Sequence, residues 1–565
     1  MEGLPKSVVA WSGLILALCV VFNCVGGYTY GEDGCASRQV HIAFGNTTSD
    51  IVVLWATKFA NCSTEVRYGD DTWDMKTVVP GSAYFFSDTD FNYIHRVILS
   101  NLEANKTYYY RPGQTEHTFY FKTTPDGTDW APDIIVYGDL GVDSETINVL
   151  ADKVSGGQYN SILHLGDIAY NLRDDGGRLG DQFMQRIQSM ASKVPYLTSP
   201  GNHESDDDTF LQYRYRFSMP HTDYPIPLDR MWYSVDIGPI HFISYSTEVF
   251  FTNGEAYVRA QHDWLIRDLE KANERRDKQP WVIAYGHQPL YCAVTDDEDC
   301  AQTQSLVRIG LEDLFYIYGV DVVLQSHEHL YERLWPMYRG TVLSKSYVNP
   351  NAPIQIISGL AGSQYGPTPV AATNPDWCAV HIAERAYPSY GRLKVYNDSH
   401  LYWEQIGVNT DIIHDYVWII KETHGPYNQS ALPEELQTKV QDSITKITNQ
   451  EKALNAISAG GSQKTLDGET IKTEEMDDDD DNNTMQIAIG TSFAVFVLLF
   501  IIGIVTARKI KQKPSSYRRW DTVDYGRKFY SNVQDADIDT DDFEVDVTDG
   551  TLPTSKLLTE EQACK

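Results

Sequence analysis

Short runs of aromatic and β-branched residues, separated by turn residues, fill the first folded stretch of the chain. The runs are Gln39 to Phe44, Ile51 to Thr57, Glu65 to Tyr68, His95 to Leu99, Thr107 to Arg111 and Thr118 to Lys122. Several short strands at this spacing are typical of a β-sandwich. We therefore expect an all-β domain over residues 35–125.

Beyond Pro125 the pattern changes to longer apolar runs, each of which stops at a polar cluster. The runs are Asp133 to Tyr137, Ser161 to Leu165, Tyr196 to Ser199, His241 to Tyr245, Trp281 to Tyr285, Asp321 to Gln325 and Pro353 to Ile357. Strands that are apolar on both faces lie between helix layers. Amphipathic helices are predicted between them at Gly180 to Lys193, His262 to Arg275 and Ser305 to Tyr318. The pattern predicts an α/β sandwich over residues 130–425.

An uninterrupted apolar run from Val8 to Phe22 stands at the N-terminus, after Lys6 and before Gly26 and Gly27. This is the layout of a secretory signal peptide, which we expect over residues 1–27. A buried first strand or helix is the alternative.

A second apolar segment, residues 485–506, contains no charged residue. As a helix it would rise about 33 Å, enough to cross a hydrocarbon core of about 30 Å. Acidic residues precede the segment and basic residues follow it, so the tail over residues 507–565 is expected in the cytosol. Residues 431–484 are then an acidic stalk, with one helix predicted from Pro433 to Ile457. We expect a type I single-pass membrane protein whose folded domains are extracellular or lumenal, at the cell surface or in lysosomes or endosomes. A buried core helix is the alternative reading of the apolar segment.

The net charge of −32 argues against nucleic acid as a partner, because like charges repel. It does not exclude a small phosphate ester, since a metal cluster can dominate the local field. N-linked glycans are expected at some of six Asn-X-Ser/Thr triplets. These are Asn46, Asn61, Asn105, Asn397, Asn428 and Asn482.

Five of the eight cysteines lie outside the signal region and the predicted tail. We predict that Cys292 pairs with Cys300, closing a short polar loop, and that Cys35 pairs with Cys62. Cys378 is left over, either free or linking two chains, and the oligomeric state stays open.

Candidate chemistry stands at the ends of five predicted strands. The clusters are Gly138-Asp-Leu-Gly, Gly166-Asp-Ile-Ala-Tyr, Gly201-Asn-His-Glu, Gly286-His and Ser326-His-Glu-His. Ligands of open α/β sheets bind beyond the carboxyl ends of the strands, so these clusters are expected to converge. A single Gly-Asp after a strand is usually only a turn, but five such clusters in order are not.

The donor types in these clusters are carboxylate, amide, imidazole and phenol, without a thiol. Such donors suit Fe, Zn or Mn. Their number exceeds the need of one ion and suits a pair that shares one carboxylate.

In this order the clusters resemble the purple acid phosphatases, within the calcineurin-like metallophosphoesterases. The N-terminal sandwich, which resembles a fibronectin type III domain, and Tyr331-Glu-Arg-Leu-Trp are similar to the larger, two-domain members. The resemblance covers about residues 38 to 420. It implies a four-layer sandwich of two mixed β-sheets flanked by helices, behind the fibronectin type III-like domain.

The resemblance also implies Fe(III) beside a divalent ion, which is Zn, Fe or Mn. Carried over motif by motif, the ligands are Asp139, Tyr170 and His329 for Fe(III), Asn202, His287 and His327 for the divalent ion, and Asp167 as the bridge. Ser326 departs from the family's usual Gly, without removing a donor atom.

The implied activity is that of an acid phosphatase, in which hydroxide at the metal pair attacks the phosphorus of a small phosphate monoester. His203 is expected to orient phosphate and to protonate the leaving oxygen. Glu204 and the acidic loop between Cys292 and Cys300 are further candidates. Two other functions stay open: a phosphodiesterase or nucleotide pyrophosphatase with the same metals, and a non-catalytic adhesion or receptor protein. The natural substrate is left undetermined.

Overall fold

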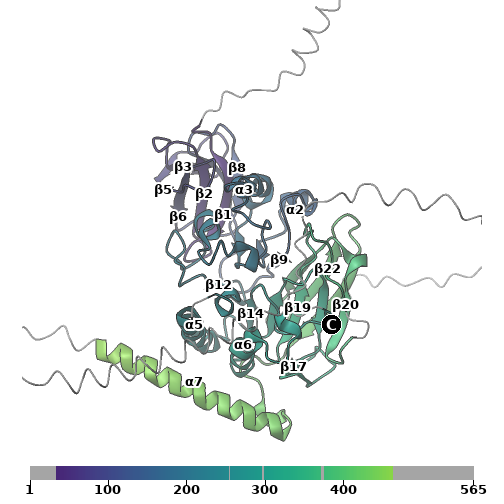
Figure 1. The fold of residues 1–565 in the computed structure, drawn as a ribbon. Helices are drawn as coiled ribbons and strands as arrows, with labels where there is room; N and C mark the ends of the chain where they lie inside the picture. The colour runs from purple at the N-terminus through teal and green to yellow at the C-terminus, as the bar shows by residue number, and fades with distance from the viewer. Residues whose placement is uncertain (1–33, 253–254, 296–297, 371–373, 462–565) are drawn as a thin grey trace, which may run out of the picture. The chain divides into compact units, whose positions relative to one another are not determined.

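A computed structural model describes residues 34–252, 255–295, 298–370 and 374–461 (Figure 1). The predicted signal peptide, the apolar segment 485–506, the tail and Asn482 lie outside the described residues. Within the described ranges, no helix combines the length and the apolar character that crossing a bilayer requires.

Two four-stranded antiparallel sheets form the N-terminal domain, which confirms the predicted all-β fold. In spatial order they are β1 (Arg38–Phe44), β2 (Ile51–Thr57), β6 (Tyr93–Leu99) and β5 (Ser82–Phe85), and β4 (Thr77–Pro80), β3 (Glu65–Gly69), β7 (Thr107–Pro112) and β8 (Phe119–Lys122). Trp55, Tyr110 and Phe121 fill the space between them and are almost fully buried. The predicted disulfide between Cys35 and Cys62 is present.

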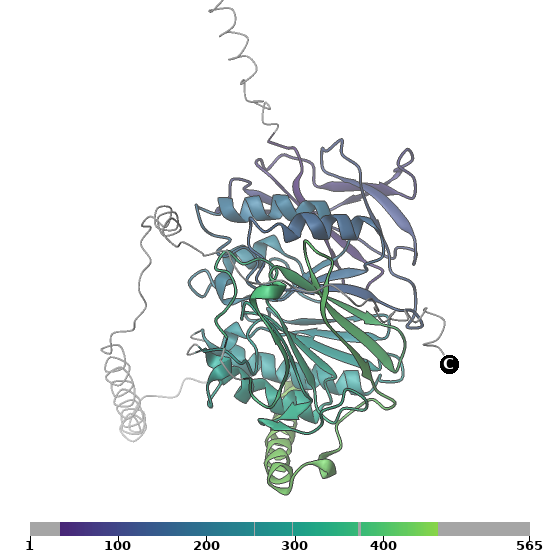
Figure 2. The ribbon, with the colours of Figure 1, turned by 90° about the vertical axis from the view of Figure 1, so that its right-hand side faces the viewer.

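Two mixed sheets form the second domain (Figure 2). The six-stranded sheet runs β11 (Tyr196–Thr198), β10 (Ser161–His164), β9 (Asp133–Tyr137), β21 (Ser389–Val395), β22 (His400–Gly407) and β23 (Ile413–Ile420). The seven-stranded sheet runs β12 (Tyr233–Ile237), β13 (Ile240–Ser244), β14 (Trp281–Tyr285), β15 (Val322–Gln325), β19 (Ile354–Ser358), β16 (Tyr331–Leu334) and β20 (Cys378–Ile382). A short hairpin of β17 (Met337–Tyr338) and β18 (Thr341–Val342) stands apart from both sheets.

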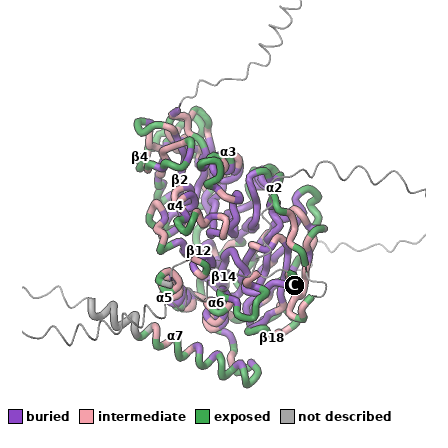
Figure 3. The backbone as a smooth tube through the Cα atoms, in the orientation of Figure 1, coloured by how far each residue is buried: buried purple, intermediate pink, exposed green. Residues whose placement is uncertain are grey.

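Helices cover the outer face of each sheet, while the inner faces pack on each other in one apolar core. Helices α2 (Thr146–Ser155) and α3 (Arg178–Ala191) pack on the six-stranded sheet. Helices α5 (Glu255–Asn273) and α6 (Leu306–Ile317) pack on the seven-stranded sheet. Figure 3 shows the strands of both sheets largely buried. The four-layer α/β sandwich is therefore confirmed.

The seven strands predicted in this domain are the ones apolar on both faces, and all seven are present. The antiparallel strands β21, β22 and β23 were not predicted, because charged residues such as Arg392, Glu404 and Asp415 interrupt their apolar pattern. In α/β domains only doubly covered strands give a continuous apolar run.

A buried carboxylate joins the two domains. Asp181 of α3 accepts hydrogen bonds from Gln39 at 2.9 Å and Thr89 at 2.5 Å in the N-terminal domain. Arg216, the last residue of α4 (Leu211–Arg216), donates to the same oxygen at 2.9 Å. Because these groups are buried and satisfied by one another, they fix how the domains pack.

The first part of the segment predicted as a stalk is a helix that packs on the second domain. Helix α7 (Glu434–Gly461) buries Leu436 and Val440 in a cluster with Tyr316 and Tyr427. The predicted helix is present, but this portion belongs to the folded body, since its apolar face covers aromatic rings.

Candidate metal centre

All seven predicted metal ligands stand on the loops that leave the carboxyl ends of five strands, each of which is parallel to a neighbour in its sheet. They are Asp139 after β9, Asp167 and Tyr170 after β10, Asn202 after β11, His287 after β14, and His327 and His329 after β15. The strands belong to both sheets, so the two sheets contribute to one site.

Three of the seven side chains form a first group. The phenolic oxygen of Tyr170 lies 2.6 Å from Nε2 of His329 and 3.3 Å from Oδ1 of Asp139. Nε2 of His329 lies 3.5 Å from the same Asp139 oxygen. The donor atoms thus face a common point, and they are the three that the resemblance assigns to Fe(III).

Three further side chains form a second group. Oδ1 of Asn202 lies 3.0 Å from Nε2 of His287 and 3.0 Å from Nδ1 of His327. The two imidazole nitrogens are 3.1 Å apart. Asp167 Oδ1 lies 3.2 Å from Nε2 of His287, and ligand atoms of Asp167, His287 and His327 all lie within 4.8 Å of one another.

Four of the seven residues adopt a left-handed backbone conformation that non-glycine residues rarely take. The φ angles are 64° at Asp139, 49° at Asp167, 55° at Tyr170 and 69° at His327. Each costs free energy that the surrounding fold must supply, and such residues cluster at functional sites. The backbone is therefore bent specifically to point these side chains inward.

The glycines before the motifs make room for neighbouring ligand side chains. A Cβ at Gly166 would lie 2.5 Å from Nδ1 of His287, and one at Gly201 would lie 2.4 Å from Oδ1 of Asp167. Gly166 also has a φ of 85°, which favours glycine. Ser326 stands where the family usually has glycine, and its hydroxyl donates a hydrogen bond to the Leu165 carbonyl.

Backbone carbonyls select the tautomers of two candidate ligands. Nδ1 of His287 donates to the Leu165 carbonyl at 2.8 Å, and Nδ1 of His329 donates to the Gly366 carbonyl at 2.7 Å. In both rings Nε2 is left with its lone pair directed to the site. Such hydrogen bonds are the usual support of metal-binding histidines.

The carboxylates of the site raise the pKa values of neighbouring donors. Burial alone would lower the pKa of His287, but Asp167 outweighs it and raises that pKa to about 10. Burial, together with Asp139 and Asp167, raises the pKa of Tyr170 well above its usual value. Protons occupy these donors unless cations replace them. The carboxylate, imidazole, amide and phenol donors fit a pair of hard or borderline cations.

His203 lies at the edge of the two groups. Its Nε2 is 3.9 Å from Oδ2 of Asp167, and its ring meets that of Tyr170 at a centroid distance of 4.7 Å. On the other side of the ring, Nδ1 lies 3.0 Å from Oδ1 of Asn171. The carbonyl oxygen of that amide accepts the Nδ1 proton, which leaves Nε2 directed toward the metal ligands. Sequence reasoning missed Asn171, whose only signal is its place directly after Tyr170.

Glu204 has a different place from the one expected of a catalytic candidate. Its fully buried carboxylate accepts hydrogen bonds from the backbone amides of Asp167, Ile168 and Gly201, each at 2.9 Å. Both oxygens are thereby engaged. Glu204 ties the β10 and β11 loops together and positions Asp167, so its carboxylate is not presented to a substrate.

The chain matches three family models. They are Calcineurin-like phosphoesterase over residues 132–331, Purple acid Phosphatase, N-terminal domain over residues 37–123, and Iron/zinc purple acid phosphatase-like protein C over residues 352–416. The first two correspond to the metal-centre domain and to the N-terminal sandwich.

Known relatives agree with these matches. Acid phosphatase type 7 of Homo sapiens is 38% identical over 438 residues, which covers 74% of this chain and 97% of that protein. Purple acid phosphatase 21 of Arabidopsis thaliana is 28% identical over 383 residues, covering 66% of this chain and 82% of that protein. The solved structure of purple acid phosphatase PPD1 from yellow lupin shares the fold, with a TM-score of 0.60 at 22% identity, covering 68% of this chain and 74% of that one.

Proposed function

The chain belongs to the purple acid phosphatase family and hydrolyses phosphate monoesters, and we propose that Fe(III) and a divalent ion do this chemistry within the seven donors described above. Asp139, Tyr170 and His329 would hold Fe(III). Asn202, His287 and His327 would hold the divalent ion, which is Zn, Fe or Mn. Asp167, beside the second group, would bridge the pair.

The observation that carries this proposal is the division of the donors into two clusters. A single ion would leave half of these buried donors without a partner, which is costly. When bound, the cation pair supplies Lewis-acid charge and lowers the pKa of water enough for hydrolysis in acid.

The chain's own side chains orient the reacting groups. Nε2 of His203 faces the site, where in the protonated ring it can donate a hydrogen bond to a phosphate oxygen and pass a proton to the leaving oxygen. Asn171 accepts the Nδ1 proton in both the neutral and the protonated ring, so it holds the ring in this orientation. Glu204 holds the loop of Asp167, so the carboxylate keeps its position through the cycle.

Asp167→Asn tests the assignment. Loss of the shared charge is expected to lower turnover by on the order of 100-fold or more and to release metal. Metal content per chain and rates on p-nitrophenyl phosphate and bis(p-nitrophenyl) phosphate would be measured. The matched control is Asp143→Asn, whose side chain is 98% exposed. Full metal content and full turnover in Asp167→Asn would refute the assignment. A wild-type protein that hydrolyses bis(p-nitrophenyl) phosphate faster than p-nitrophenyl phosphate would instead favour a phosphodiesterase.

We further propose that the protein is exported, glycosylated and anchored by residues 485–506. In support, the five sequon asparagines that the structure describes, Asn46, Asn61, Asn105, Asn397 and Asn428, are exposed. Treatment of intact cells with an N-glycosidase and a protease would test the topology. A protein that loses no mass on deglycosylation and stays in the carbonate-soluble fraction would contradict this topology.

A further inference from the structure

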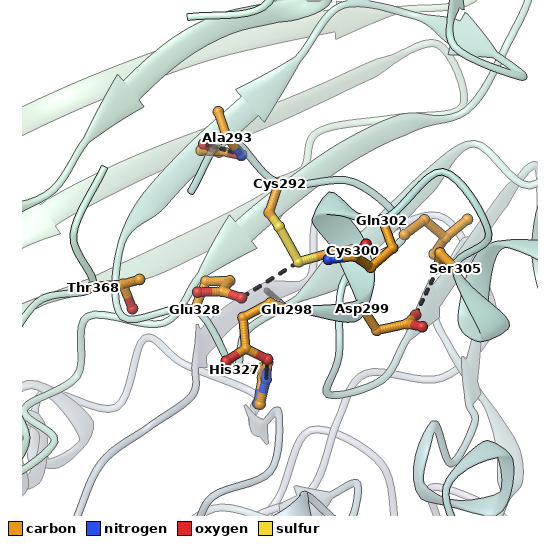
Figure 4. Close-up of a disulfide and its surroundings, with 12 residues drawn as sticks. Cys292, Ala293, Glu298, Asp299, Cys300, Gln302, Ser305, His327, Glu328 and Thr368 are labelled. Carbon is orange, nitrogen blue, oxygen red and sulfur yellow. Dashed lines mark hydrogen bonds and ion pairs between the residues drawn. A yellow bond between two sulfur atoms is a disulfide. The ribbon is translucent and has the colours of Figure 1, made fainter. Parts of the chain in front are cut away.

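The polar loop closed by the Cys292–Cys300 disulfide lies beside one ligand of the proposed divalent site. Figure 4 shows Glu298 of this loop next to His327 and Cys300 next to Glu328. Oε2 of Glu298 lies 3.4 Å from Nε2 of His327. The other nitrogen of the same ring, Nδ1, faces Asn202 and His287. The imidazole therefore lies between a carboxylate and the predicted metal position.

His327 is oriented differently from the other two candidate histidines. His287 and His329 donate hydrogen bonds from Nδ1 to backbone carbonyls. For His327, the Nδ1 atom points into the site and a side-chain carboxylate takes the place of the carbonyl. Glu328 adds a second acidic group, which is buried, and ligand atoms of Glu298, His327 and Glu328 lie within 4.8 Å of one another. The orientation of this ring thus depends on acidic side chains.

Three connections hold Glu298 in place. The disulfide joins Cys292 to Cys300, which stands two residues after Glu298, with a Cα–Cα distance of 5.4 Å. Oδ1 of Asp299 accepts from the amide of Leu306 at 2.9 Å, which binds the loop to the start of α6. Arg308 donates to the Cys300 carbonyl at 2.7 Å. These contacts anchor the chain immediately after Glu298, and from there its side chain, which is 42% exposed, reaches His327.

General metal chemistry gives this arrangement a consequence. A histidine ligand must present a lone pair, so the proton must sit on the nitrogen that faces away from the ion. A carboxylate on that nitrogen fixes the tautomer and makes the ligand more basic, which strengthens its bond to the ion.

We propose that Glu298 is a positioning residue of the divalent site, which holds His327 with Nδ1 toward the ion, and that the Cys292–Cys300 disulfide keeps Glu298 there. The inference rests on the proposed function, since it assumes that His327 binds the divalent ion. The sequence analysis named the acidic loop as a candidate for the site without assigning a role to Glu298.

The disulfide thereby acquires a role beyond stability. An exported compartment keeps such a bond oxidised, whereas the cytosol would reduce it. Only the oxidised form would hold the divalent ion tightly, so the enzyme would reach full activity after export.

The test compares Glu298→Ala, Glu298→Gln and the wild-type protein. Each is loaded with metal and exposed to EDTA, and the iron and the divalent ion remaining per chain are followed separately over time. Glu298→Ala is expected to lose the divalent ion about 10- to 100-fold faster, with little change in iron. Glu298→Gln keeps an oxygen acceptor for the Nε2 proton, so its rate of divalent-ion loss is expected to lie between those of wild type and Glu298→Ala. Glu116→Ala, which removes a carboxylate that is 99% exposed, is the matched control.

A second comparison tests the disulfide. Cys292→Ser/Cys300→Ser is expected to show the same selective loss of the divalent ion. Cys35→Ser/Cys62→Ser removes the other disulfide, in the N-terminal domain, and should retain both ions. Circular dichroism and melting of each variant would establish that it is folded. If Cys292→Ser/Cys300→Ser does not fold, the Glu298 variants decide whether Glu298 positions His327.

The outcomes separate this inference from the function on which it rests. Wild-type protein that binds fewer than two ions overturns both. Wild-type protein with two ions, and Glu298→Ala that releases the divalent ion at the wild-type rate, overturns the inference alone. Equal loss of both ions in Glu298→Ala also overturns it, because the effect would not be specific to the site of His327.

Discussion

The phenolic oxygen of Tyr170 lies 2.6 Å from Nε2 of His329, although 159 positions separate the two residues in the chain. Tyr170 follows a strand of the six-stranded sheet, and His329 follows a strand of the seven-stranded sheet. The site is therefore assembled only when the two sheets pack, so a variant that loses metal while staying folded reports on the ligands themselves.

Tyr170→Phe is expected to abolish the visible absorption of the iron-loaded protein, because charge transfer between the Tyr170 phenolate and the proposed Fe(III) would be the source of that absorption. The phenyl ring can keep the packing against His203, but the oxygen near His329 and Asp139 is lost. The visible spectrum and the iron content of the purified protein would be measured. Tyr365→Phe is the control, because its ring lies 5.2 Å from that of Tyr170 yet it is not a predicted ligand. A coloured Tyr170→Phe protein would contradict the ligand assignment.

Asn171→Ala is expected to lower kcat between about 10- and 100-fold, because the ring of His203 loses the acceptor that fixes it. Metal content should not change, since Asn171 is not a ligand. Asn171→Asp retains the acceptor oxygen and is expected to recover most of the activity. Steady-state kinetics with metal analysis would check this, and equal kcat in Asn171→Ala and wild type would refute the role.

Glu204→Gln is expected to destabilise the protein by about 1–3 kcal/mol, because the new amide opposes a buried backbone N–H group. The three amides now bound are those of Asp167, Ile168 and Gly201. Denaturant unfolding would measure the loss, with Glu116→Gln as an exposed control. The shape of the pH–rate profile should be unchanged. Loss of one limb of the pH–rate profile without any loss of stability would show that Glu204 acts as a general acid or base.

Stability is expected to fall between about pH 6.5 and pH 9 through His241. Burial alone would lower the pKa of His241, but hydrogen bonds to Asp236 and Asp268 raise it to about 9. A raised folded-state pKa contributes stability below the unfolded value and loses it as the pH rises through the folded value. The contribution is about 3 kcal/mol.

Denaturant midpoints at about pH 6 and about pH 9.5 would test this in wild type and in His241→Gln. The variant should show a smaller change with pH than wild type. His221→Gln, at an exposed position, is the control. An unchanged pH dependence in His241→Gln would show that the stability loss arises elsewhere.

Val440→Asp is expected to release α7 from the body. Val440 is 1% exposed against the aromatic cluster that contains Tyr316 and Tyr427, and its burial contributes about 2 kcal/mol. Limited proteolysis should then cut near the start of α7. Gln441→Asp, on the exposed face of the same helix, should not change the cleavage pattern. Resistance of both variants would mean that α7 packs without help from this side chain.

The sequence alone determined the two folded domains, the parallel strands of the second domain and both disulfides. These could be read because each depends on a local pattern: a strand buried on two faces is a continuous apolar run, and a ligand at its end follows a glycine. Asp139, Asp167 and His287 were predicted as ligands in this way. The same logic fails for β20–β23, which carry no such run.

Only the tertiary structure decided which groups support the ligands. Glu204 could not be distinguished from a catalytic acid by its neighbours in the chain, because its role depends on amides of Asp167 and Ile168, more than thirty residues earlier. Glu298 likewise meets His327 across 29 positions. Helix α7 covers the ring of Tyr316, which precedes the helix by more than a hundred positions. Spacing along the chain encodes strands and turns, whereas hydrogen bonds between loops exist only once the sheets have packed and set their distances.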